Sequence, residues 1–173
     1  MMNEVTPEKC ILLLKESGCS DEVIKHCICV RDLSIKIAKI AKADLKTVEV
    51  GALLHDIGRS KTHGIDHGVE GVKIAKENKL PTKITKIIER HIGAGIPKKT
   101  AVKLGLPSKD YIPKTLEEKI VCHADSLTNN CEKQKIEDEI NEALEKNLTE
   151  YALRLRKLHD ELSKICGIDL NYL

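Results

Sequence analysis

Residues 53–59, Leu53-Leu54-His55-Asp56-Ile57-Gly58-Arg59, place a histidine and an aspartate side by side where an apolar helix should end. Neutral imidazole and carboxylate are both ligands of divalent transition-metal ions, and neither is common in the last buried turn of a helix. An adjacent His and Asp is a weak signal by itself. The interpretation therefore depends on the other His and Asp residues of the chain.

Four of these residues fall on apolar faces of predicted helices. Steps of three and four residues align each of them with Val, Ile, Leu or Ala side chains, where a core normally has only aliphatic residues. A single core histidine is most often a satisfied one that is hydrogen-bonded to a backbone carbonyl. A buried carboxylate needs an opposite charge, and no Lys or Arg shares these faces, so we expect a metal ion to supply it. The four residues are His26, His67, His91 and Asp125.

The composition favours one globular domain, which we expect to span residues 1–173. Hydrophobic residues make up 41% of the chain and aromatic residues only 2%, with no Phe or Trp, so Ile, Leu and Val must fill the core. With 29 basic and 27 acidic residues, the net charge of +2 does not indicate nucleic-acid binding.

The sequence also indicates a compartment. No run approaches the roughly 18 apolar residues of a membrane span, and the polar start MMNEVTPEKC is unlike a secretory signal. The seven cysteines form no CxxC pair, and Cys27 and Cys29 point in different directions on a helix, so we interpret both as structural. We expect a cytoplasmic protein with reduced thiols and no membrane partner.

Helix start and stop signals dominate the chain, whereas strand alternation is nearly absent. The predicted fold class is therefore all-α, with about six core helices over residues 20–130, an N-terminal helix at 6–17 and a C-terminal helical extension over 134–173. Gly58 is expected to end its helix in the left-handed conformation. The predicted N-caps are Thr6, Ser20, Asp44 and Asp66. The predicted helices cover 7–17, 20–41, 44–58, 66–78, 82–91, a short stretch within 98–114, 116–129, and 136–166 with a break near 147–149.

With this order of ligands the chain resembles the HD-domain metal-dependent phosphohydrolases, and more narrowly the subgroup with the HDIG signature. The resemblance covers about residues 22–130 and implies a helical bundle. His67, in His-Gly-Val-Glu-Gly, and His91, in Arg-His-Ile-Gly, are similar to the extra histidines of binuclear members, which implies a second ion bridged by Asp56. The residues similar to the ligands of the first ion are His26, His55, Asp56 and Asp125.

The chain departs from two branches of that family. Residues 93–97, Gly-Ala-Gly-Ile-Pro, are similar to the Gly-x-Gly-Tyr-Pro run of the cyclic-dinucleotide phosphodiesterases, but Ile96 replaces the tyrosine and the segment after His91 is shorter. These differences argue against cyclic di-GMP as the substrate. The mononuclear deoxynucleotidases have an acidic residue soon after the His-Asp pair, where this chain has Arg59 and Ser60.

The resemblance implies hydrolysis of a phosphomonoester or phosphodiester, in a nucleotide or similar small phosphate compound, by a metal-activated hydroxide. Asp56, Arg59 and Lys61 are the expected catalytic residues, and Arg59 and Lys61 are expected to bind phosphate oxygens. His63 is a further candidate substrate contact, although a solvated loop histidine is the alternative. The mixed ligand set suits one or two ions of Mn, Fe, Co, Ni or Zn.

Two other functions fit the same ligands. Some relatives with this six-ligand arrangement hold two irons and activate dioxygen, so a di-iron oxygenase is one alternative. A metal-binding regulatory module, with residues 134–173 as a docking arm, is the other. Arg59 and Lys61 favour hydrolysis, because both side chains are positively charged and can bind phosphate oxygens. His159 is interpreted as a packing residue, and His123 as either a core residue or a partner of a ligand. A homo-oligomer is compatible with the sequence.

Overall fold

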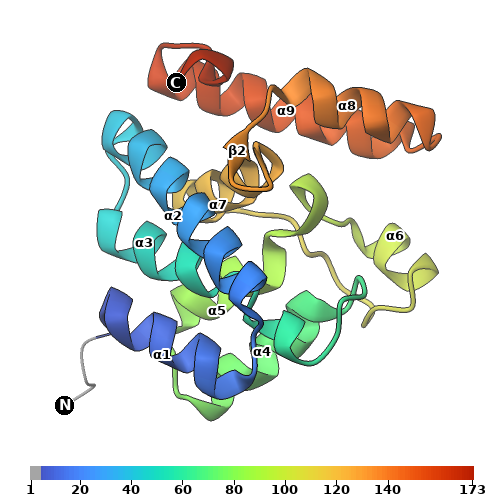
Figure 1. Ribbon diagram of the computed structural model, residues 1–173. Helices are drawn as coiled ribbons and strands as arrows, with labels where there is room; N and C mark the ends of the chain where they lie inside the picture. Colours follow the sequence, from blue (N-terminus) through green and yellow to red (C-terminus); the bar gives the residue numbers. More distant parts are fainter. Residues whose placement is uncertain (1–4) are drawn as a thin grey trace.

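Residues 5–173, which the computed structural model describes, form a series of helices joined by turns and loops, with α8 and α9 lying together along one side (Figure 1). The predicted all-α fold class is confirmed. None of the helices in this range combines the length and apolar character needed to cross a membrane. The α-helices are α1 (Pro7–Ser17), α2 (Asp21–Ala41), α3 (Leu45–Leu54), α4 (His67–Glu77), α5 (Thr82–Arg90), α6 (Lys98–Lys103), α7 (Leu116–Ser126), α8 (Ile136–Glu145) and α9 (Thr149–Cys166). Short 3-10 turns lie at η1 (Ile57–Ser60), η2 (Ile92–Ala94) and η3 (Leu170–Tyr172).

Most of the predicted helix starts are confirmed by side-chain caps. Thr6, Ser20 and Asp44 each accept a hydrogen bond from the backbone N–H three residues later, as an N-cap does. Asp66 precedes α4 but makes no such bond. Its carboxylate instead accepts a hydrogen bond from the hydroxyl of Thr62, with 3.0 Å between the two oxygens. The predicted break near 147–149 is confirmed as the turn between α8 and α9.

Helix α7 ends three residues before the predicted end, because a small hairpin follows it. Strands β1 (Thr128–Asn129) and β2 (Glu132–Lys133) pair antiparallel, with Asn129 opposite Glu132. The hairpin directly follows the helix that carries Asp125, so it fixes the course of the chain beside that residue.

Helix α3 lies between two clusters of buried aliphatic side chains. Its residues Val48 and Ala52 belong to a cluster shared with α2, α7 and α9, whereas Leu53 and Leu54 belong to one shared with α1, α2, α4 and α5. Ile, Leu and Val fill most of both clusters, as the composition predicts. Because both faces of α3 are buried, the His55-Asp56 pair that follows it is held in the middle of the molecule.

The role expected for Gly58 is wrong. Gly58 lies within η1 and has no positive φ, so it is not a left-handed helix end. A Cβ atom at this position would lie 1.8 Å from the carbonyl oxygen of His67 and 2.6 Å from the backbone nitrogen of Gly71. The missing side chain therefore allows η1 to lie directly against the first turn of α4, which brings His67 toward Asp56.

We expect Gly58→Ala to destabilise the protein by about 2–3 kcal/mol, because the clash is with backbone that can relax only if two elements separate. Gly51→Ala is the matched control, since its added Cβ would meet only side-chain atoms of Ile87 and no backbone. Denaturant unfolding measures the free energy of unfolding of both variants. Equal stability of the two variants would contradict this role for Gly58.

Candidate metal centre

The His55-Asp56 pair is buried immediately after α3. The His55 side chain is fully buried and Asp56 is 3% exposed. The Nδ1 atom of His55 lies 2.7 Å from the carbonyl oxygen of Ala52, in the last turn of α3. This carbonyl can only accept, so the ring donates its Nδ1 hydrogen, and in the neutral ring the lone pair is therefore on Nε2. The helix end thus fixes the ring in the form that binds a metal ion.

His67 and His91 are oriented in the same way from two other elements. Nδ1 of His67, at the start of α4, lies 2.7 Å from the carbonyl oxygen of Gly64, and Nδ1 of His91, after α5, lies 2.8 Å from that of Ile88. Both rings therefore direct Nε2 inward, and these two Nε2 atoms are only 3.0 Å apart. Two lone pairs at that distance repel each other unless a proton or a metal ion lies between them.

The carboxylate of Asp56 faces two separate pairs of imidazoles. Its Oδ1 atom lies 3.2 Å from Nε2 of His67 and 3.4 Å from Nε2 of His91. Its Oδ2 atom lies 3.7 Å from Nε2 of His55 and 3.8 Å from Nε2 of His26. One carboxylate is thus positioned between two groups of nitrogen ligands, one at each oxygen.

Asp125 completes the group around Oδ2. Its Oδ1 atom lies 2.9 Å from Nε2 of His26 and 3.5 Å from Nε2 of His55. His26 comes from α2 and Asp125 from α7. With the residues at the ends of α3 and α5 and at the start of α4, five helices contribute to the two groups around Asp56. All six residues predicted as metal ligands therefore lie together: His26, His55, Asp56, His67, His91 and Asp125.

The donor atoms of this cluster fit a divalent cation. Within residues 5–173, Nε2 of His55 and Oδ1 of Asp56 are buried and have no hydrogen-bond partner. Buried polar atoms are rarely left unpaired, because each loses its bonds to water. Imidazole nitrogens mixed with carboxylate oxygens are a suitable donor set for Mn, Fe, Co, Ni or Zn. The residues therefore could hold metal, although this arrangement does not identify the element.

The electrostatics of the cluster favour positive charge. Burial disfavours the charged imidazole of His55, but the carboxylates of Asp56 and Asp125 outweigh it and raise its pKa well above the ordinary value. Burial would raise the pKa of each carboxyl, yet the neighbouring imidazoles hold both pKa values below their usual range. Burial lowers the pKa of His91, which favours the neutral ligand form.

Arg59 makes a contact that the sequence interpretation missed. The sequence predicted Arg59 as a phosphate ligand and placed no Lys or Arg on the ligands' helix faces, but Nε of Arg59 lies 2.6 Å from Oδ2 of Asp56. The tight turn η1 causes this, because it folds the side chain three residues later back over the carboxylate. The Arg59 side chain is 31% exposed, so it joins the buried cluster to the surface.

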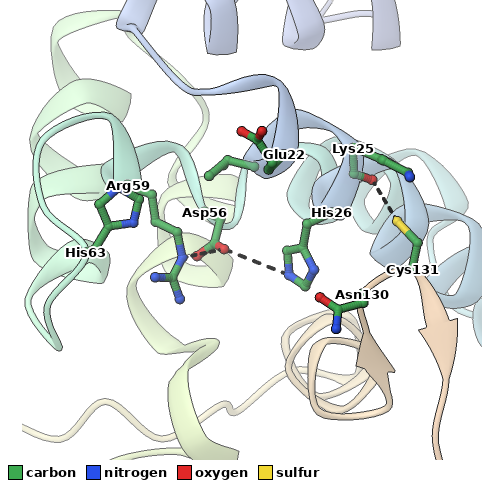
Figure 2. A pocket seen from close by; sticks show the side chains of 9 residues that line it. Glu22, Lys25, His26, Asp56, Arg59, His63, Asn130 and Cys131 are labelled. Carbon is green, nitrogen blue, oxygen red and sulfur yellow. Dashed lines mark hydrogen bonds and ion pairs between the residues drawn. The ribbon is translucent and has the colours of Figure 1, made fainter.

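A cavity of about 450 Å³ opens over the cluster (Figure 2). Arg59 and His63 lie on one side of it and His26 on the other, with Asp56 between them. Lys61 is exposed and is not one of the cavity-lining residues, so the structure does not bring it together with Arg59. Glu22, Lys25, Asn130 and Cys131 also line the cavity, and no sequence signal had singled them out for this site.

The expectation of reduced thiols is wrong for two of the cysteines. Cys29 on α2 and Cys131 in the hairpin form a disulfide across 102 residues. Periodicity places Cys29 on a helix but says nothing about a partner so distant in sequence. The five free cysteines are Cys10, Cys19, Cys27, Cys122 and Cys166.

His123 and His159 form a separate pair between α7 and α9. Nε2 of His123 lies 3.1 Å from Nδ1 of His159, whose Nε2 lies 3.0 Å from a carboxylate oxygen of Asp169. Both rings are buried, and neither lines the cavity. Both histidines are therefore buried between helices and outside the cavity, as expected for packing residues.

Comparison with known proteins gives the family. The HD domain profile matches residues 23–130. The chain is 44% identical over 164 residues to a tRNA (cytidine(56)-2′-O)-methyltransferase of Picrophilus torridus, covering 95% of this chain but only 48% of that protein. It is also 44% identical over 163 residues to an uncharacterized protein of Methanocaldococcus jannaschii, covering 91% of each. The chain thus spans about half the length of the first of these relatives.

A solved structure has the same fold. The HD domain of the L. monocytogenes phosphodiesterase PgpH in complex with cyclic-di-AMP matches with a TM-score of 0.55 and 18% identity, over 90% of this chain and 96% of that one. At this identity the match extends to the fold alone. Because the family profile covers more than half of the sequence, the chain belongs to the HD-domain family.

Proposed function

We propose that this protein is a metal-dependent phosphohydrolase that cleaves a phosphomonoester or phosphodiester in a nucleotide or similar small phosphate compound. The observation that carries the proposal is the pair of inward-facing Nε2 atoms of His67 and His91, 3.0 Å apart beside an unpaired oxygen of Asp56. This arrangement favours a bound metal ion, and family membership makes phosphate chemistry the leading use for one.

In this proposal His67, His91 and Oδ1 of Asp56 would hold one ion, and His26, His55, Asp125 and Oδ2 of Asp56 the other. Bound divalent ions lower the pKa of water and offset the negative charge of a phosphate. The carbonyl oxygens behind His55, His67 and His91 keep the three rings oriented.

Arg59 has two roles in the proposed reaction. Without an added ion its guanidinium neutralises Oδ2 of Asp56 at 2.6 Å. Once the charge of Asp56 is shared with an ion, the N–H groups of Arg59 are available to the oxygens of a phosphate in the cavity. His63, on the same side of the cavity, would contact the same substrate.

The nucleotide part of the proposal has indirect support. One relative is named for a tRNA methyltransferase, and the PgpH domain was solved with cyclic-di-AMP. We do not propose methyl transfer for this chain, because it aligns with only 48% of that relative and its buried His and Asp cluster suits phosphate chemistry. The di-iron oxygenase and the regulatory module stay predictions without a specific structural observation in their favour. The extent of the domain over 1–173 and the cytoplasmic location are likewise proposals.

Purified protein loaded with Mn²⁺ is expected to release p-nitrophenol from p-nitrophenyl phosphate or its bis-ester. Asp56→Asn and His55→Ala should each reduce turnover at least about 100-fold, because each removes a charge or ligand from the reacting centre. Lys157→Ala, on the exposed side of α9, is the control and should retain wild-type turnover. Inactivity of the wild type toward mono- and diesters with all five candidate metals would overturn the proposed function.

The number of bound ions can be measured without a substrate. Elemental analysis after dialysis should give two ions per wild-type chain and about one for His67→Ala, because that ring belongs only to the group around Oδ1. Calorimetric titration with Mn²⁺ should show the same loss of one site. A wild-type value of one, or no change in His67→Ala, would contradict the two-ion arrangement.

Arg59 and Lys61 can be separated by kinetics. Arg59→Ala should lower kcat at least about 10-fold, since it loses a charge-assisted contact to the phosphate. Lys61→Ala should have a clearly smaller effect, because its side chain does not line the cavity. Equal losses in the two variants would show that Lys61 reaches the substrate.

A further inference from the structure

The hairpin after α7 has an unusual two-residue tip. Asn129 pairs with Glu132, so Asn130 and Cys131 form the whole loop. Both loop residues have positive φ angles, 48° and 64°, as in a type I′ turn. Asn adopts this conformation readily at the first position, whereas the second is normally glycine, because a side chain is unfavourable there. Cys131 therefore needs another interaction to hold it in this conformation.

The disulfide with Cys29 provides that interaction. Cys29 lies on α2 three residues after His26, and Cys131 lies six residues after Asp125. The bridge therefore connects the two chain segments that supply His26 and Asp125. The sulfur of Cys131 is also 3.5 Å from the carbonyl oxygen of Lys25, so the tip lies directly against α2. The turn is fixed to the helix that forms one wall of the cavity.

This attachment places Asn130 at the cavity. Its side chain lies beside the ring of His26, across the cavity from Arg59 and His63 (Figure 2). Arg59 provides positive charge for a phosphate, whereas the amide of Asn130 offers an NH2 group that donates hydrogen bonds beside a carbonyl oxygen that accepts them. A nucleobase edge presents the same combination of groups, and amide side chains bind such edges in pairs of hydrogen bonds.

We propose that Asn130 is a specificity residue that binds the base of a nucleotide substrate, and that the Cys29–Cys131 disulfide positions it by holding the strained turn. This inference rests on the proposed function, since it assigns the substrate class of the same cavity. Asn130, Cys29 and Cys131 are not among the six proposed ligands, so each can be changed without removing a ligand.

Binding to Mn²⁺-loaded protein tests the role of Asn130. The probes are the four ribonucleoside 5′-monophosphates and ribose 5-phosphate, which lacks the base, each used as its non-hydrolysable phosphonate and measured by calorimetric titration. The wild type should bind at least one nucleotide more tightly than ribose 5-phosphate. Asn130→Ala should weaken the binding of that nucleotide about 10-fold, in the range of one amide–base contact, and leave the affinity for ribose 5-phosphate unchanged. Equal binding of all five probes by the wild type, or equal weakening of all by Asn130→Ala, would overturn the proposal.

Two substitutions of Cys131 test the positioning. Cys131→Ser removes the bridge and leaves a side chain in the left-handed conformation, so its nucleotide affinity should fall toward that of Asn130→Ala. Cys131→Gly also removes the bridge but adopts this conformation freely, so it should keep near-wild-type affinity. If the glycine variant loses as much affinity as the serine variant, or if neither loses any, the disulfide does not act through the turn.

Reduction of the wild type gives a test without mutation. Dithiothreitol should convert the bridge to two thiols while it is itself oxidised to a cyclic disulfide, and nucleotide affinity should then fall as in Cys131→Ser. The same treatment should leave Cys131→Gly unchanged. Thiol titration confirms that the bridge is reduced. If the nucleotide affinity of the reduced wild type is then unaltered, the proposal is contradicted.

The failure of this inference is distinguishable from that of the proposed function. Hydrolysis of p-nitrophenyl esters without tighter binding of nucleotides than of ribose 5-phosphate would support the proposed phosphohydrolase and contradict the base contact. Inactivity toward every phosphoester would contradict the proposed phosphohydrolase. A base contact at Asn130 could then not belong to a substrate.

Discussion

The repulsion between buried electron-rich atoms around Asp56 is the constraint on which the centre of this structure depends. The Nδ1 hydrogens of His55, His67 and His91 are donated to backbone carbonyls, so three Nε2 lone pairs face two carboxylates in a buried space. Without a cation, protons and the guanidinium of Arg59 are the available compensation. The fold is thus arranged to accept positive charge on both sides of the Asp56 carboxylate.

The helical scaffold fixes this arrangement through backbone more than through side chains. Helix α3 is buried on both faces, so its end cannot move without opening both core clusters. Gly58 then lets η1 touch α4, and that contact sets the distance between the two ligand groups. The run from His55 to Gly58 therefore combines two functions, since His55 and Asp56 provide donor atoms and the glycine brings the proposed ligand His67 close.

Local pattern was sufficient to predict the helices and to place His26, His67, His91 and Asp125 on inward faces, because periodicity is a property of neighbouring residues. That these faces converge came from the resemblance to the family, since spacing along a chain does not determine which helices meet. The true role of Gly58 and the bridge between Cys29 and Cys131 escaped prediction because both depend on contacts between distant segments. The cavity wall at Asn130 was unrecognised for the same reason.

Anomalous diffraction from crystals of the Mn²⁺-loaded protein tests the central claim most directly. Two metal peaks are expected, one between Oδ1 of Asp56 and the His67 and His91 rings, and one on the Oδ2 side beside His26, His55 and Asp125. Both should disappear in Asp56→Ala or lose most of their occupancy. A structure in which the loaded metal lies elsewhere, with the His67 and His91 nitrogens still 3.0 Å apart and no ion beside them, would contradict it.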